Sequence, residues 1–167
     1  MRIYKENPSK IRIFGERDFW VNGIIGAISL SSIVPFYLDV LININTLPKN
    51  ENLTKTFFNN EFKYYIDKDS NIFITSISNT EKTKELFNTQ PFKLLTKEHF
   101  WVSGLKRNFD LSPLIQLYLY VMNNFEELSN NVREFTIGRC TIVFQVDEEK
   151  NINLITGWTG SRKKLIN

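Results

Sequence analysis

Residues with obvious chemistry are few, because the chain of 167 residues contains one His and one Cys. His99 could act as a general base only beside an acid or a nucleophile, and no spacing supplies such a partner. We interpret Cys140, in a predicted strand, as a small core or edge residue. One residue of each type is too few for a zinc site or a Ser-His-Asp or Cys-His triad. These counts predict a non-enzymatic protein with no metal and no cofactor.

Two acidic turns are the remaining candidates for ligand chemistry. Asp67 and Asn71 in the first turn recur as Asp147 and Asn151 in the second. Neither turn has the Gly and the terminal Glu that a calcium loop needs, so hairpin turns explain them better. The seven Gly residues are scattered and form no phosphate-binding loop.

The repeated turns belong to an internal duplication. The segment Phe-Trp-Val-Asn-Gly at 19–23 recurs as Phe-Trp-Val-Ser-Gly at 100–104, and ten of the 26 positions from Phe19 to Ile44 match identically at the same offset. Downstream of this stretch, the spacing between matching positions of the two copies is one residue shorter. We therefore predict a single compact domain, 1–167, made of two repeats at 11–78 and 92–160 with a linker at 79–91 that could hold a short helix.

The pattern within each repeat predicts the same order of elements. A helix begins near Ser32 in the first copy and at Ser112–Pro113 in the second, and a hairpin follows each helix. The Phe-Trp-Val run is rich in residues that favour strands. The predicted fold is α+β, with duplicated β-(β)-α-β-β units, antiparallel strands and two pseudo-symmetric helices packed on the sheet.

One stretch has the length and hydropathy of a membrane span. Residues 24–44 contain a single charge, Asp39. The equivalent stretch of the second copy carries Lys106, Arg107 and Asp110, which would be costly at bilayer depth. We therefore predict a loop followed by a core helix, with no membrane contact and a cytoplasmic location.

The Trp and Gly residues of the repeated motif are expected to serve the scaffold. We interpret Trp20 and Trp101 as aromatic anchors packed on the helix, with Gly23 and Gly104 in tight turns. A paired aromatic platform for a partner is the alternative.

Function is expected where the copies differ. Residues 24–28 are apolar and form either a docking patch or ordinary packing, whereas the matching stretch is charged. Trp158 has no clear counterpart, and a basic cluster follows it. The candidate partner-binding residues are Trp158, Lys106, Arg107, Asn108, Arg162, Lys163 and Lys164.

In size, composition and lack of a catalytic constellation, the chain resembles small bacterial immunity proteins, which neutralise secreted or contact-delivered toxins. The resemblance implies a non-catalytic module whose protein partner is a toxin domain. It carries no specific motif, so no binding residue is transferred. The sequence pI of about 8.9 argues against an acidic inhibitor of a basic nuclease.

The alternative is RNA binding or a small ribonuclease. The stretch 139–164 resembles the last strands of RelE-type toxins, which use scattered basic residues. The charge would come from Arg139, Arg162, Lys163, Lys164 and His99, and RNA binding would weaken with salt. The duplication does not fit this class. A small-ligand site between the two halves is a third hypothesis.

Overall fold

The computed structural model describes the backbone of residues 2–5, 10–57, 60–79, 91–128, 130–159 and 163–166. Side chains are described for residues 10–57, 60–78, 91–128 and 130–157. The predicted linker helix lies outside these ranges.

The same order of elements occurs twice along the chain. The first unit contains β2 (Ile13–Gly15), α1 (Arg17–Ile24), the 3-10 helix η1 (Leu30–Ser32), α2 (Ile33–Ile42), β3 (Leu53–Phe57), β4 (Asn60–Ile66) and β5 (Ile72–Asn79). The second contains β6 (Lys93–Leu95), α3 (Glu98–Arg107), α4 (Ser112–Leu128), β7 (Val132–Ile137), β8 (Cys140–Val146) and β9 (Asn151–Thr159). Two further strands are β1 (Arg2–Lys5) and β10 (Lys163–Ile166).

The two units form separate sheets with matching strand order. The first is β2-β5-β4-β3, and the second contains the matching order β6-β9-β8-β7. In both sheets the first pair is parallel and the two hairpin pairs are antiparallel. The second sheet also gains β1 beside β7 and β10 beside β9. The predicted α+β class and duplication are confirmed, and the sheet is not continuous between the halves.

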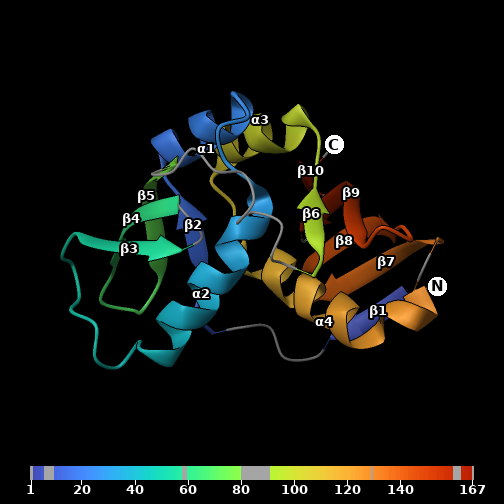
Figure 1. Ribbon diagram of the computed structural model, residues 1–167, viewed down its shortest axis with the longest axis horizontal. Coiled ribbons are helices and arrows are strands. Elements are labelled where there is room, and N and C mark those ends of the chain that lie inside the picture. Colours follow the sequence, from blue (N-terminus) through green and yellow to red (C-terminus); the bar gives the residue numbers. More distant parts are fainter. Residues whose placement is uncertain are drawn as a thin grey trace.

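The two sheets lie on the outside, with α2 and α4 between them, while α1 and α3 lie together at one end (Figure 1). The core on the α2 side is aromatic: the Phe36 ring stacks on that of Phe62 at 4.3 Å between centroids. Buried Leu114, Leu117 and Val121 lie on α4. Each sheet therefore buries the face that meets its helix and leaves the other face outward.

Equivalent hydrogen bonds confirm the duplication at atomic detail. The side chain of Asp67 accepts from the backbone N–H of Asn71 at 2.9 Å, and Asp147 accepts from that of Asn151 at 2.9 Å. The hairpin turns therefore have the same capped geometry in both units. This confirms that turn structure explains the repeated Asp and Asn residues.

The repeated Phe-Trp-Val segments are helical, so the strand predicted there is wrong. They form the centres of α1 and α3, which pack against each other. Strand propensity reflects packing more than backbone preference, and here the helix–helix contact decides. Each unit is therefore β-α-α-β-β-β.

The glycines of the motif do not form turns, which corrects a second prediction. A Cβ atom added to Gly23 would fall 2.0 Å from the Trp101 ring, and one added to Gly104 would fall 2.1 Å from the Trp20 ring. Each indole therefore lies directly on the glycine of the other helix. The two Trp rings also meet at 6.0 Å between centroids. The aromatic-anchor interpretation is correct, but the anchor joins the two units.

A second pair of contacts crosses between the units. The N–H of Ile13 in β2 donates to the Asp110 carboxylate before α4, at 3.0 Å. The N–H of Leu94 in β6 donates to the Ser31 hydroxyl before α2, at 2.7 Å. The first strand of each unit is thus held by the helix start of the other.

Both predicted helix starts hold to within a residue or two. Helix α2 begins at Ile33 with Ser32 as its N-cap residue and Pro35 in its first turn. Helix α4 begins at Ser112, but Asp110 supplies the capping oxygens, accepting from the Ser112 N–H and hydroxyl at 2.9 and 2.7 Å.

The stretch 24–44 forms a loop, η1 and the core helix α2, as predicted. Residues Ile33, Phe36 and Val40 of α2 are completely buried in the protein. Among the described residues, no helix has both the length and the apolar composition needed to cross a bilayer.

The Gly104→Ala substitution tests the reciprocal contact. The new methyl group must displace the Trp20 ring, and overpacking of this kind costs about 1–3 kcal/mol. We expect the free energy of unfolding, measured with urea, to fall by that amount. The control is Ser103→Ala in the same helix, which we expect to leave stability nearly unchanged. Equal stability of Gly104→Ala and the wild type would contradict the described packing.

Candidate protein-binding surface

Cys140 is not placed to act as a nucleophile. Its side chain is buried at the start of β8. Burial, with the nearby Asp110 carboxylate, raises the pKa of the thiol to about 12. Burial also raises the pKa of Asp110 itself, although hydrogen bonds from Ser112 and Ile13 oppose the shift. Both groups therefore fit a structural role in the core between the units.

His99 lies in the first turn of α3 and is exposed. Within the described part of the chain, no cluster of three or more His, Cys, Asp or Glu side chains could hold a metal ion. Lys106 and Arg107 are also exposed, in the last turn of α3, where their charges favour the negative end of the helix.

Asn108 has a visible structural role. It ends α3 in a left-handed conformation, with φ of 47°, and its N–H donates to the Gly104 carbonyl at 2.7 Å. Its side-chain oxygen accepts from the Trp20 indole at 3.3 Å. Asn108 therefore helps to hold the Trp20 ring on the partner helix.

The predicted C-terminal cluster is only partly described. The backbone of Trp158 pairs with Thr141 of β8 and Lys164 of β10. The side chains of Trp158, Lys163 and Lys164 and the whole of Arg162 lie outside the described residues.

The apolar loop after α1 exposes one large side chain. Ile25 is 69% exposed, beside the small exposed residues Gly26 and Ala27, whereas Ile24 and Ile28 pack partly against the core. Two of the loop's three isoleucines are thus used in packing.

The outer face of the first sheet carries an aromatic row. Phe14 of β2 stacks on Phe73 of β5 at 5.3 Å between centroids, and Phe73 stacks on Tyr65 of β4 at 5.0 Å. All three side chains are half-buried. The Tyr65 hydroxyl lies 3.2 Å from the Glu16 carboxylate. Partial burial and this carboxylate raise the pKa of Tyr65, so its hydroxyl donates the hydrogen bond.

The second unit has no such row at the same positions. Phe14 pairs in register with Phe73, and Leu95 pairs equivalently with Asn153. Gln145 pairs with Asn153 as Tyr65 pairs with Phe73. A row of three aromatic rings in one unit therefore corresponds to Leu95, Asn153 and Gln145 in the other.

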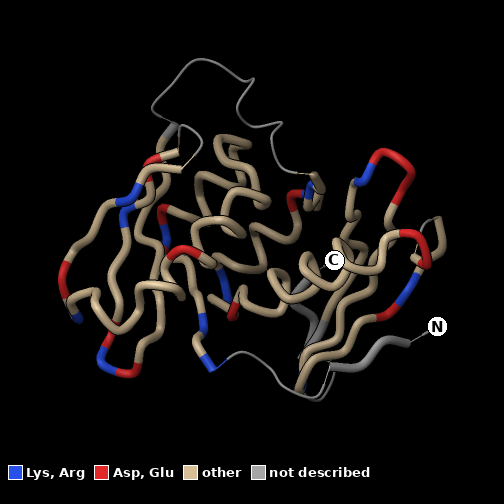
Figure 2. Tube along the Cα trace, turned by 60° about the horizontal axis from the view of Figure 1, so that its bottom comes forward, with Lys and Arg blue, Asp and Glu red and all other residues tan. Residues whose placement is uncertain are grey.

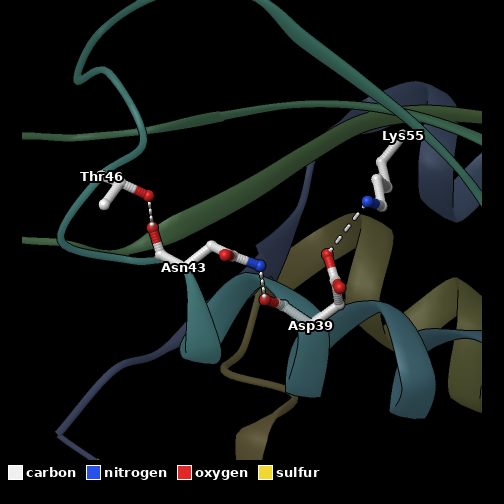
Figure 3. Close-up of polar contacts among 4 residues, drawn as sticks. All are labelled: Asp39, Asn43, Thr46 and Lys55. Carbon is white, nitrogen blue, oxygen red and sulfur yellow. Dashed lines mark hydrogen bonds and ion pairs between the residues drawn. The ribbon is translucent and has the colours of Figure 1, made fainter.

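A second difference lies beside β3. Lys55 of β3 forms an ion pair with Asp39 of α2 at 3.4 Å, and the Asn43 amide donates to the Asp39 carbonyl at 2.9 Å (Figure 3). The Thr46 hydroxyl in turn donates to the Asn43 carbonyl. The ion pair is partly exposed, at 43% for Lys55 and 32% for Asp39. The end of α2 and the edge of β3 thus form a polar margin.

The same place in the second unit is apolar. Asp39 corresponds to Tyr120 and Lys55 to Phe135, whose rings meet at 5.8 Å between centroids. Phe135 is completely buried. The aromatic row and the polar margin are the two surface features that sequence reasoning missed. An alignment of the two repeats with each other would have shown both differences.

Charge along the described trace is mixed. Figure 2 shows Lys and Arg interspersed with Asp and Glu on both units. Comparison with family models, with curated proteins and with solved structures finds no match for this chain.

The burial of Cys140 predicts slow alkylation. With a thiol pKa of about 12, about one thiol in ten thousand is ionised at pH 8. We expect iodoacetamide to modify the folded protein far more slowly than the urea-unfolded protein at pH 8. The rate should rise with pH up to about 12 while the fold persists. Equal rates in the folded and unfolded states at pH 8 would contradict the buried position.

Proposed function

We propose that the protein is a non-catalytic protein-binding module, and that the outer face of the first sheet contacts its partner. The observation that carries the proposal is the aromatic row of Phe14, Phe73 and Tyr65. Aromatic side chains are enriched at protein interfaces, where they provide large, rigid contact areas.

The asymmetry between the units supports this assignment. A scaffold requirement of the duplicated fold would apply to both sheets, yet the second sheet has Leu95, Asn153 and Gln145 at the same register positions. The fold of such a unit therefore does not require the three rings, which supports a role for them in binding.

The ring geometry favours a protein over a nucleic acid. Bases bind by stacking on free aromatic faces. Here the ring planes of Phe14 and Tyr65 lie 20° and 10° from the plane of Phe73, so the three rings stack on one another. The central Phe73 ring is stacked on both sides. The interspersed charges of Figure 2 also contrast with the positive groove that follows a nucleic-acid backbone.

The narrower proposal is that the partner is a toxin and the chain a cytoplasmic bacterial immunity protein. Its support is the general resemblance in size and composition. The identity of a captured partner tests it, and a partner other than a toxin would refute this narrower statement alone.

The test exchanges residues between the units. The triple variant Phe14→Leu, Tyr65→Gln, Phe73→Asn places the second unit's residues in the first sheet. We expect the tagged wild type to capture a stoichiometric protein from its native cells, and the variant to lose at least about tenfold in affinity for the purified partner. Titration calorimetry measures the difference.

The control is Leu95→Gln on the outer face of the second sheet, which we expect to keep full affinity. Circular dichroism establishes that each variant is folded. Undiminished affinity of the triple variant would contradict the proposed surface. Capture of RNA, with binding that weakens steeply between two salt concentrations, would refute the protein-binding function itself.

A further inference from the structure

We propose that the edge of β3 binds an extended segment of a partner protein as an additional, parallel strand. The partner segment pairs with residues 54–56 and presents a hydroxyl or amide side chain beside Lys55. This inference rests on the proposed function, since it specifies how the partner contributes to the interface.

The second unit shows that this fold accepts a strand at the equivalent edge. There, β1 lies parallel to β7, with Arg2 in register with Glu134 and Lys5 with Ile137. Strand β7 thus has β8 on one side and β1 on the other. The strand comes from the far N-terminal end of the chain, so it is an addition to the unit.

Strand β3 occupies the position of β7 in the first unit. It pairs with β4 from Leu53 opposite Tyr64 to Phe57 opposite Asn60. Within the described part of the chain, it is the last strand of its sheet. The β7 positions paired with β1 correspond to residues 54–57 of β3, of which Thr54 and Thr56 are exposed. Backbone groups at such an edge are a template for another strand.

The side chains at this edge specify what the incoming strand must carry. In the second unit, the position opposite Ile3 of β1 is Phe135, whose ring meets Tyr120. In the first unit the same place is held by Lys55 and Asp39, whose charged groups are both partly exposed (Figure 3). An apolar side chain there would remove water from the ion pair and offer no hydrogen bond in its place. A hydroxyl or amide side chain can hydrogen-bond to it.

Lys55 makes the edge selective. Lysine on an edge strand discourages pairing with arbitrary apolar strands. A second copy of this chain could offer β1 only by releasing it from β7, and in the same register its Ile3 would lie opposite Lys55. The polar margin therefore disfavours self-association and favours a partner strand of different sequence.

The experiment compares hydrogen exchange in β3 and β7 of the full chain, with and without peptide probes. In the free protein we expect the β3 amides facing away from β4 to exchange at least about tenfold faster than the equivalent β7 amides. One probe is a synthetic peptide with the sequence of residues 1–7, and the other is the same peptide with Ile3→Ser. At millimolar concentration, the Ser peptide should slow exchange of these β3 amides about threefold, and more than the Ile peptide does.

A specificity exchange provides the matched variant. Asp39→Tyr with Lys55→Phe gives the first unit the ring pair of the second, and we expect the preference to reverse toward the Ile peptide. The two-peptide comparison on the wild type remains decisive if this variant does not fold.

Three results would overturn the inference. These are equal protection of β3 and β7 in the free protein, no effect of either peptide on β3, or protection of β3 that rises with protein concentration through self-association. Any of them leaves the calorimetric test of the aromatic row unaffected, so failure of the strand site and failure of the proposed function are distinguishable.

Discussion

The structure depends on the reciprocal contact between two tryptophans and two glycines. Trp20 lies on Gly104 and Trp101 lies on Gly23, so the helices α1 and α3 approach more closely than any side chain at the glycines would permit. This contact joins the ends of the two units, and the Ile13–Asp110 hydrogen bond adds a second crossing nearby. A unit of about 70 residues would be only marginally stable alone, whereas two interlocked units share one core.

This constraint explains which features the two copies share. The Phe, Trp and Gly residues of the motif are buried between the units and are therefore unavailable to a partner. The hairpin turns repeat because Asp67 and Asp147 cap them identically. The outward sheet face and the outer strand edge carry no such requirement, so they differ between the units. These are the two surfaces for which binding is proposed.

The sequence predicted the class, the duplication and the helix starts, because these depend on local patterns and on internal similarity. It failed at the Phe-Trp-Val segments, since strand propensity was overridden by the packing of Trp20 and Trp101 on the opposite helix. The aromatic row was missed because Phe14 and Phe73 lie far apart in sequence and meet only through parallel pairing. Asn108 was expected at a partner interface, and its contact with the Trp20 indole becomes visible only in three dimensions.

The central claim is that the two units fold as one cooperative body through their reciprocal contact. Equilibrium urea unfolding of the full chain, followed residue by residue by hydrogen exchange, tests it most directly. We expect the core amides of β4 and β8 to be exposed at the same midpoint with the same slope, because neither sheet persists once the Trp–Gly contact is lost. Separate midpoints for the two strands, with one sheet intact while the other is unfolded, would contradict the account.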